Sequence, residues 1–354
     1  MKICIINDTH SGARGENPHV DAHFFRFWDG VFFPYLKEHG ITTVFHLGDV
    51  VDRRKYINFK TLHTWRTKFF EPLREYDVHI LLGNHDIFHK NTSEVNAIDE
   101  ILGHYRNVTI YRDARDLTID GLTVAMIPWI NEENEERTKE FLTTTRATIA
   151  FGHLEIAGFE MDKGYIAQEG LSKDLFRRFA QVYTGHFHHR SNDGHIFYLG
   201  NQYQITWVDY DDPRGFHVFD TDTQTIEFIE NPHILFHKIV YNDEIHTQEY
   251  WKTFDFARYK NTYVKVVVEN KKNPYLFDIT METLQKQNPI DVMIVEDFTD
   301  PNANTDPALI NQSEDTVTIL SNYIDTQKFE VPTDRLKTIM KDLYFEALTT
   351  DHTA

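Results

Sequence analysis

The most informative part of the sequence is His79-Ile80-Leu81-Leu82-Gly83-Asn84-His85-Asp86. In this segment an apolar run leads directly into a turn of polar side chains. A short, nearly continuous apolar run that ends at glycine is typical of a strand buried on both faces. The same pattern occurs at four other places, over Ile3–His10, Thr43–Asp52, Thr148–His153 and Gln181–His188. These five strands predict one domain, which we place at residues 1–236.

Helical patterns separate the first three of these strands. Apolar residues recur at helical spacing over Phe24–His39 and Phe59–Glu75, and Pro34 is expected to kink the first helix. Alternating strands and helices are typical of the α/β class. Two β-hairpins are also expected, with turns at Asp120-Gly121 and at Asp220–Thr223.

The pattern changes after residue 236. Strands are expected at His237–Tyr241, Tyr263–Glu269 and Asp291–Glu296, and a helix over Phe277–Gln287. Residues 237–298 are therefore predicted to form a small α+β cap.

The C-terminal part consists of two segments that differ in composition. Residues 299–330 lack Lys and Arg until Lys328 and are rich in turn-forming residues, so they are predicted to be an acidic linker. Residues 331–354 are predicted to contain an amphipathic helix. Its apolar stripe consists of Leu336, Ile339, Met340, Leu343 and Ala347.

Composition limits the class of protein. The length of 354 residues suggests about two domains, and 41% hydrophobic with 26% charged residues excludes wholesale disorder. The single cysteine, Cys4, leaves no partner for a disulfide within the chain and no thiolate zinc cluster, and it fits a cytoplasmic protein. No apolar run is long enough to span a bilayer, so no membrane association is expected. The net charge of −19 argues against a passive nucleic-acid binder, but it is compatible with an enzyme that acts on nucleic acid.

The polar residues after the five strands form the candidate site. The carboxyl ends of strands make the ligand-binding edge of an α/β sheet, so residues far apart in sequence can meet there. Within Asp8-x-His10 and His186-x-His188 both side chains can point the same way if the backbone remains extended. Oxygen and nitrogen ligands without sulfur favour Mn²⁺, Fe²⁺ or Zn²⁺ over Ca²⁺. There are enough ligands for two ions, which can activate a water and stabilise charge on a phosphoryl group.

Each motif taken alone also has a structural interpretation. Gly83-Asn84-His85 can be an ordinary turn, and His153 can be a hydrogen-bonded core histidine. Five such motifs in this order are far less easily explained by chance. The remaining histidines follow no strand-end pattern and are interpreted as structural.

The ordered motifs resemble the calcineurin-like metallophosphoesterase superfamily. More narrowly, the chain resembles the SbcD-type double-strand-break repair nucleases, and above all the recombination endonuclease subunits of tailed phages. The motifs cover about the first 190 residues, and the segment from Tyr198 to Phe216 extends the likeness to about residue 220. The resemblance implies a metallophosphoesterase β-sandwich flanked by helices, a DNA-positioning cap and a helical tail that binds a partner.

The resemblance also implies the roles of the site residues. Two Mn²⁺ ions are expected, with Mg²⁺ able to substitute, and Asp49 is expected to bridge them. His85 is expected to lie beside the scissile phosphate as a proton donor or charge stabiliser, with Asp86 orienting it; Asp52 receives no assigned role. The ligands would be Asp8, His10, Asp49 and His188 for one ion, and Asp49, Asn84, His153 and His186 for the other.

Partner contacts complete the set of expectations. Cations that follow the metal motifs are candidates for DNA contacts, although each can equally be an ordinary solvated charge. The helical stripe of the tail is expected to dock on an SbcC-type coiled-coil ABC ATPase, the alternative being packing on its own domain. A homodimer within a heterotetramer is expected, in the host cytoplasm if the chain is phage-encoded. The candidate DNA contacts are Arg14, Arg53, Arg54, Lys55 and Arg190.

The predicted function is a manganese-dependent DNA nuclease, a 3′–5′ exonuclease on duplex DNA and an endonuclease on single strands. It would be the nuclease subunit of an ATPase–nuclease complex for end processing, recombination and repair. One alternative is a stand-alone metallophosphatase or cyclic phosphodiesterase with the same metal centre. The other is a non-catalytic scaffold that binds DNA ends.

Overall fold

The computed structural model describes residues 1–296 together with Leu336 and Lys337. The chain divides into two units, Met1–Asp297 and Phe298–Ala354. In the second unit only Leu336 and Lys337 are described, and both have a helical backbone. The predicted linker over residues 299–330 and the tail residues Ile339, Met340, Leu343 and Ala347 lie outside the described residues. Among the residues described, no helix is long and apolar enough to cross a membrane.

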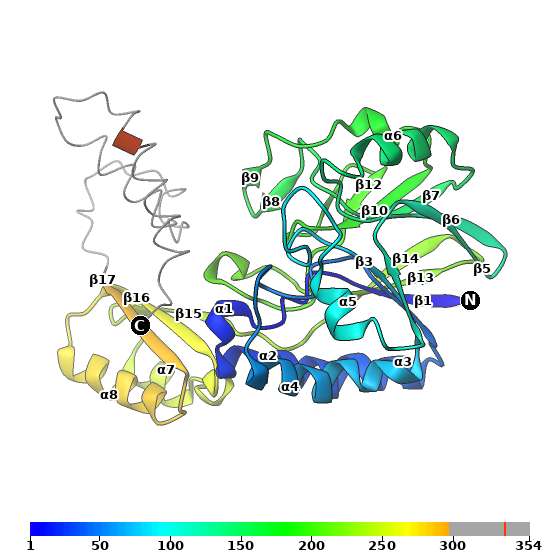
Figure 1. Cartoon of the computed structure of the whole chain (residues 1–354). Coiled ribbons are helices and arrows are strands. Elements are labelled where there is room, and N and C mark those ends of the chain that lie inside the picture. The colour runs from blue at the N-terminus through cyan, green and yellow to red at the C-terminus, as the bar shows by residue number, and fades with distance from the viewer. Residues whose placement is uncertain (297–335, 338–354) are drawn as a thin grey trace. The chain divides into compact units, whose positions relative to one another are not determined.

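The first unit is built around two six-stranded sheets (Figure 1). The first sheet has the order β14-β13-β1-β2-β3-β4, in which β1 to β4 are parallel and β13 runs antiparallel to both of its neighbours. The strands are β1 (Lys2–Ile6), β2 (Thr43–His46), β3 (Asp77–Leu81), β4 (Val108–Tyr111), β13 (Gly215–Asp220) and β14 (Thr225–Glu230).

The second sheet has the order β11-β12-β10-β7-β6-β5. The expected hairpins are confirmed, because β5 pairs with β6 across Asp120-Gly121 and β13 pairs with β14. The five motif strands are thus shared between two sheets, three in the first and two in the second. The strands of the second sheet are β5 (Arg115–Ile119), β6 (Leu122–Ile127), β7 (Ile149–His153), β10 (Gln181–Gly185), β11 (Ser191–Asn192) and β12 (Ile196–Tyr198).

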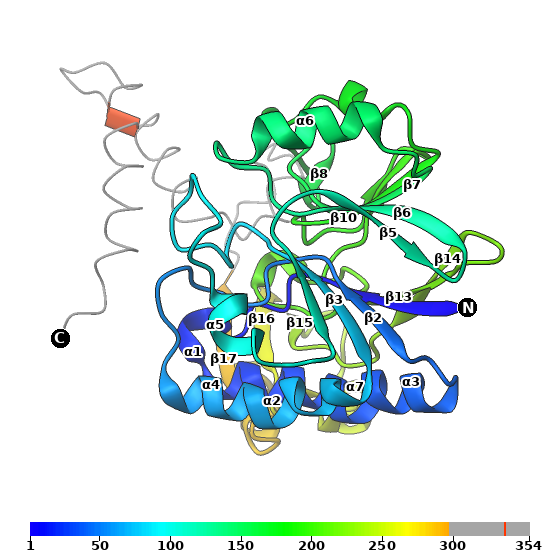
Figure 2. The same cartoon turned by 45° about the vertical axis from the view of Figure 1, so that its right-hand side comes forward.

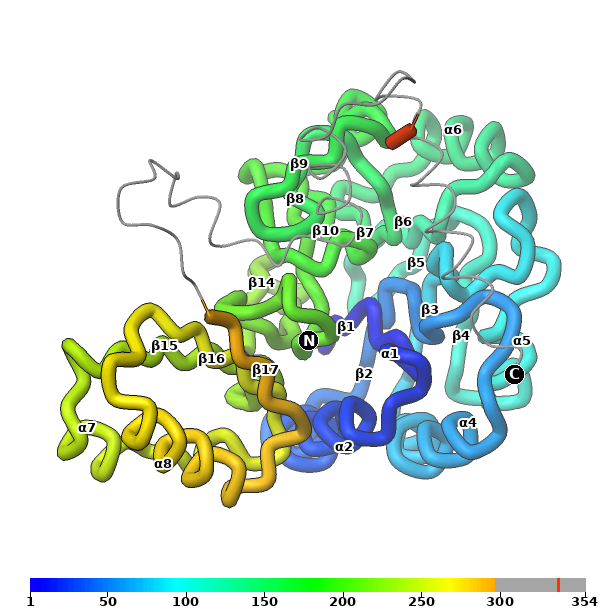
Figure 3. Tube along the Cα trace, turned by 90° about the vertical axis from the view of Figure 1, so that its left-hand side faces the viewer, coloured from blue at the N-terminus to red at the C-terminus, as the bar shows by residue number. Residues whose placement is uncertain are grey.

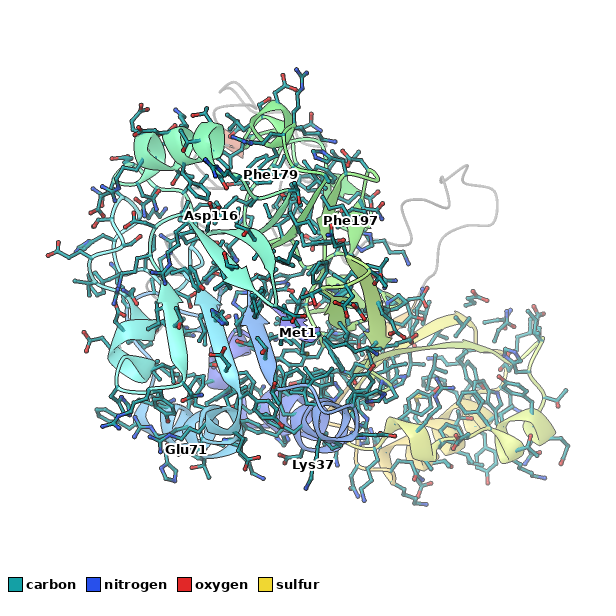
Figure 4. The ribbon with its side chains drawn as sticks, turned by 90° about the vertical axis from the view of Figure 1, so that its right-hand side faces the viewer. Met1, Lys37, Glu71, Asp116, Phe179 and Phe197 are labelled. Atoms are coloured by element: carbon teal, nitrogen blue, oxygen red, sulfur yellow. The ribbon has the colours of Figure 1, made fainter. Side chains whose placement is uncertain are left out.

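The two sheets pack face to face through apolar side chains. Ile3 and Ile5 of β1 lie in the core between the sheets with Phe45 and Phe151, whereas Cys4 belongs to the core under the helices. This alternation follows from the period of two along a strand. The N-terminus closes the edge of the sandwich, since its ammonium group donates to Asp120 at 2.6 Å (Figure 4, where Met1 is labelled).

Helices cover the outer faces of both sheets (Figures 1 and 2). The predicted helix at Phe24 begins earlier, at Pro18, where Asn17 caps it by accepting from the His19 N–H. Pro34 does not break it, because the helix widens into a π-helical turn and Pro34 then occupies the first turn of the next helix, where no N–H is needed. The elements are α1 (Ala13–Glu16), α2 (Pro18–Phe27), η1 (Trp28–Phe32), α3 (Phe33–Glu38), α4 (Phe59–Trp65), η2 (Arg66–Phe70), η3 (Pro72–Glu75), α5 (Ala97–Leu102) and α6 (Glu135–Thr144).

A three-stranded parallel sheet with two helices on one face follows, and we call it the β15–β17 subdomain (Figure 3). It has its own core, which includes Tyr241, Trp251 and Phe277. It also packs on the sandwich, because Tyr263 lies in the core under the helices and its hydroxyl accepts from Asn17 at 3.1 Å. Its elements are β15 (Phe236–Asn242), α7 (Gln248–Thr253), η6 (Ala257–Tyr259), β16 (Tyr263–Asn270), α8 (Pro274–Gln285) and β17 (Asp291–Glu296). The remaining short elements of the first unit are β8 (Glu160–Asp162), β9 (Tyr165–Ile166), η4 (Lys173–Phe176) and η5 (Trp207–Asp209).

Candidate metal centre

The turns after β1, β2, β3, β7 and β10 converge at one edge of the sandwich. Backbone hydrogen bonds join the first two turns, from the Asp8 N–H to the Gly48 carbonyl at 2.9 Å and from the His10 N–H to the Asp49 carbonyl at 3.1 Å. The Asp8 carboxylate then accepts from the His186 N–H of the other sheet at 3.0 Å. The two sheets are therefore tied together at the place where their polar side chains meet.

The backbone of the site is left-handed at four non-glycine residues, so the condition of an extended backbone is not met at Asp8, His10 or His186. The φ angles are 49° at Asp8, 43° at His10, 56° at Asp49 and 86° at His186. Such conformations cost of order 1–3 kcal/mol each and persist only where the surroundings enforce them. Gly48 shows the crowding, because a Cβ there would lie 2.6 Å from Nδ1 of His153.

One cluster of candidate ligands joins Asp8, His10 and His188. The Nε2 atoms of His10 and His188 lie 3.0 Å apart, and Nε2 of His10 lies 4.0 Å from Oδ1 of Asp8. That buried Oδ1 has no hydrogen-bond partner within residues 1–296. A buried carboxylate oxygen without a donor, facing imidazole nitrogens, fits a cation held between them.

A second cluster joins Asp49, His153 and His186. Oδ2 of Asp49 lies 3.4 Å from Nε2 of His153 and 3.9 Å from Nε2 of His10, so this carboxylate borders both clusters. The side-chain oxygen of Asn84 lies 3.0 Å from Nε2 of His153. All the expected ligands are therefore brought together, in two groups that share Asp49.

The electrostatics of the clusters fit a divalent cation. Burial lowers the pKa of His186 and of His188 to about 3, so both rings are neutral, which is the form that binds a metal. Burial and the nearby Asp49 charge raise the pKa of Asp8 to about 6. Burial alone would lower the pKa of His153, but the Asp49 carboxylate outweighs it and raises the value to about 9. Two carboxylates buried this closely require positive charge, which two cations would supply.

His85 forms a third candidate group with His10 and Asp49, between the other two, and one of its ring nitrogens is already engaged. The ring Nδ1 of His85 donates to the backbone carbonyl of Asp52 at 2.6 Å. The backbone N–H of His85 donates to Oδ1 of Asp49 at 2.8 Å. Its ring lies edge-on to His10 with centroids 4.9 Å apart. Since Nδ1 is the donor to Asp52, Nε2 is the nitrogen available to a ligand.

Asp86 does not orient His85, contrary to the sequence-based expectation. Its carboxylate accepts from the N–H groups of Gly83, Asp49 and Val50 at 2.8 Å each, and from that of Val51 at 3.2 Å. These bonds join the turn after β2 to the turn after β3. Asp86 is thus a positioning residue for Asp49, and the carbonyl of Asp52 takes over the expected role toward His85.

The candidate DNA-contacting cations differ in their surroundings. Arg54 is partly buried, with Nη1 lacking a hydrogen-bond partner among the described residues, and burial lowers its pKa while Asp49 opposes this. Arg53 donates to the Tyr56 hydroxyl at 2.6 Å. Arg190 lies over the Phe228 ring at 3.7 Å, so it faces β14. Arg14 and Lys55 are exposed.

Two residues of the site were missed by the sequence analysis. The Trp129 ring lies 5.0 Å from the ring of His186 and 6.0 Å from that of His153. It follows the end of β6 by two residues, so the strand-end rule could have found it. Arg214 is buried, pairs with Asp209 at 2.6 Å and donates to the His188 carbonyl, which holds the turn of that ligand. Only its tertiary contacts show this.

Two groups of buried Asp, Asn and His at the edge of a two-sheet sandwich define the class of metal-dependent phosphoesterases. The family described as calcineurin-like phosphoesterase matches residues 1–190, and this chain belongs to that family. Exonuclease subunit 1 of Enterobacteria phage T4 is 31% identical over 354 residues, covering 98% of this chain and 99% of that protein.

Solved structures give weaker matches. A protein described as a novel archaeal phosphodiesterase is 14% identical with a TM-score of 0.32, covering 65% of this chain and 100% of its own. A protein of unknown function from Aquifex aeolicus is 16% identical with a TM-score of 0.26, covering 50% and 93%. At these TM-scores neither structure adds to the argument.

Proposed function

We propose that the protein is a manganese-dependent DNA nuclease, with 3′–5′ exonuclease activity on duplex DNA and endonuclease activity on single strands. The observation that carries the proposal is the relationship to exonuclease subunit 1 of phage T4, which extends over 98% of the chain. A phosphoesterase fold alone would be equally compatible with a small phosphate ester as substrate.

The ligand assignment follows the two clusters. Asp8, His10 and His188 would hold one cation, and Asn84, His153 and His186 would hold the other, with Asp49 as a ligand that both groups could share. The mixture of nitrogen and oxygen ligands suits Mn²⁺, with Mg²⁺ as a weaker substitute. When bound, two divalent cations supply a nucleophilic water and neutralise charge on the phosphoryl group.

His85 is the residue proposed to donate a proton to the leaving group. With Nδ1 held by the Asp52 carbonyl, Nε2 would face the substrate, and the ring in its doubly protonated form would donate the Nε2 proton to the departing 3′ oxygen. Asp86 keeps Asp49 in register by holding the backbone of the neighbouring turn. Trp129 supports the rings of His153 and His186.

The remaining parts of the proposal concern partners. Arg53 and Arg54 follow the Asp49 turn and contact DNA phosphates, together with the more exposed Arg14, Lys55 and Arg190. Residues 237–298 position the DNA, and residues 331–354 bind an SbcC-type ATPase across a linker at 299–330. The proposed assembly is a homodimer within a heterotetramer in the cytoplasm, which is that of the host if the chain is phage-encoded.

The test compares two substrates in the presence of Mn²⁺. Release of nucleotides from linear duplex DNA, lost on adding EDTA, supports the nuclease. Turnover of a small aryl phosphate without DNA cleavage would support the stand-alone phosphoesterase. DNA binding without either activity would support the scaffold.

A further inference from the structure

A positively charged cavity lies where helix α2 meets the β15–β17 subdomain (Figure 3 shows the two elements). It is lined by Arg26 of α2, by residues of the segment 232–237 and by residues of the segment 257–262. Its volume is about 550 Å³, within the range that binds small ligands. None of the metal-centre residues lines it.

The cavity is positively charged, whereas the chain as a whole is negatively charged. Arg26, Arg258 and Lys260 line it, and no Asp or Glu is among the lining residues. Nη2 of Arg26 lies 3.3 Å from Nδ1 of His233, and none of the three cations forms an ion pair within residues 1–296. In a chain of net charge −19, three cations in a cavity whose lining contains no carboxylate make a local site for an anion.

Two histidines lie on this side of α2, and only His233 lines the cavity. His23 lies on α2 one turn before Arg26, is 2% exposed, and neither of its ring nitrogens has a hydrogen-bond partner among the described residues. Its ring centroid lies 6.5 Å from that of His233. An unsatisfied buried polar group costs about 1–3 kcal/mol. His23 does not line the cavity, whereas His233 does, so a ligand in the cavity would meet the imidazole of His233 and not that of His23.

We propose that this cavity is a second phosphate-binding site, which takes either a phosphodiester of a nucleic-acid strand or the phosphate of a released nucleotide. Two guanidinium groups grip phosphate oxygens in a planar fork, and neutral imidazole adds a hydrogen-bond donor. The choice of phosphate among anions rests on the proposed function, whereas the presence of an anion site does not.

The experiment uses the full-length protein in EDTA, so that the metal centre cannot hold the phosphate. The variant Arg26→Gln/Arg258→Gln is compared with Lys37→Gln/Lys60→Gln, which removes the same charge from exposed positions of the helix layer (Lys37 is labelled in Figure 4). The probes are a labelled single-stranded oligonucleotide, followed by anisotropy, and dAMP, followed by calorimetry. We expect the first variant to bind at least about 10-fold more weakly, and the control to bind as the wild type does.

Each outcome decides the proposal. Weaker oligonucleotide binding, with a salt slope lower by about 1.4 for two lost contacts, identifies the strand as the ligand. Weaker binding of dAMP alone identifies the released nucleotide. Equal binding by both variants, or no binding by the wild type, overturns the site. If the double variant unfolds, Lys260→Gln replaces it. Mn²⁺-dependent release of nucleotides from linear duplex DNA by the wild type, measured without EDTA, reports separately on the proposed function.

Discussion

At the scale of single residues, substitution of Asp49 should have the largest effect on the site, because its carboxylate borders both ligand clusters. Asp49→Asn removes the negative charge between two cations but keeps Oδ1, the acceptor for the His85 N–H. We expect a folded protein with weaker Mn²⁺ uptake. Substituting a residue that only hydrogen-bonds to a metal ligand typically lowers activity by roughly 10–100-fold, and the loss of nuclease activity in Asp49→Asn should be larger than that. Activity assays and metal analysis measure both effects.

The matched control for this change is Asp113→Asn, which alters an exposed carboxylate paired with Arg137. It should behave as the wild type. Two bound Mn²⁺ ions and normal cleavage in Asp49→Asn would contradict the bridging assignment.

His85 separates chemistry from binding. His85→Gln removes the proton donor while leaving both ligand clusters intact, so cleavage should fall by about 10²–10⁴-fold with metal content and DNA affinity retained. The control is His63→Gln on the exposed side of α4. If the metal content of His85→Gln also falls, His85 is a ligand and its role as an acid is wrong.

At the scale of elements, the contact of α2 with α4 contains a buried carboxyl group. Asp21 of α2 accepts from Nε1 of Trp65 in α4 at 3.0 Å. Burial raises the pKa of Asp21 to about 6, above its usual 3.8. The folded state therefore binds more protons than the unfolded state between about pH 4 and 6, and stability falls as the pH rises through this window.

Asp21→Asn should remove this penalty, because the amide oxygen can still accept from Trp65 while carrying no charge. We expect the free energy of unfolding at pH 7 to rise by about 1–3 kcal/mol, with the gain disappearing below about pH 4. Urea unfolding at pH 7 and pH 4 measures it, with the exposed Asp29→Asn as control. An equal or lower stability at pH 7 would show that the carboxylate is stabilised there.

At the scale of the whole molecule, the proposed roles of net charge in DNA binding and of the tail in ATPase binding can be tested together. A net charge of −19 repels DNA at long range, so the ATPase should supply much of the binding. Ending the chain before Val331 should keep basal Mn²⁺-dependent cleavage and remove co-purification with the ATPase. The apolar stripe of the tail accounts for this, since each fully buried large side chain contributes roughly 1.5–3 kcal/mol.

A point substitution refines the truncation. Leu343→Ser should weaken ATPase binding, whereas Lys341→Ser, in the same predicted helix, should not. Unfolding or loss of basal cleavage on truncation would show that the tail belongs to the core of this chain. Unchanged ATPase binding would place the docking surface elsewhere.

Local elements and the identity of the side chains that gather at the candidate site were predictable from the sequence. The turn residues at Asp120-Gly121, the apolar runs of the five strands and the ligand set around Asp49 were all predictable. Turn propensity, burial period and ligand type are properties of a few neighbouring residues, and short segments carry them.

Only the tertiary structure decided which groups meet. The division of the strands between two sheets, the Asp86 bonds to the neighbouring turn and the contacts of Trp129 join segments distant in the sequence. The left-handed backbone at Asp8 is likewise enforced by hydrogen bonds from another strand. The physical reason is that a hydrogen bond or a facing charge depends on distance in space, which no local pattern encodes. The cavity lined by Arg26 and Arg258 is the clearest case, because these two arginines are far apart along the chain and line the same cavity only after folding.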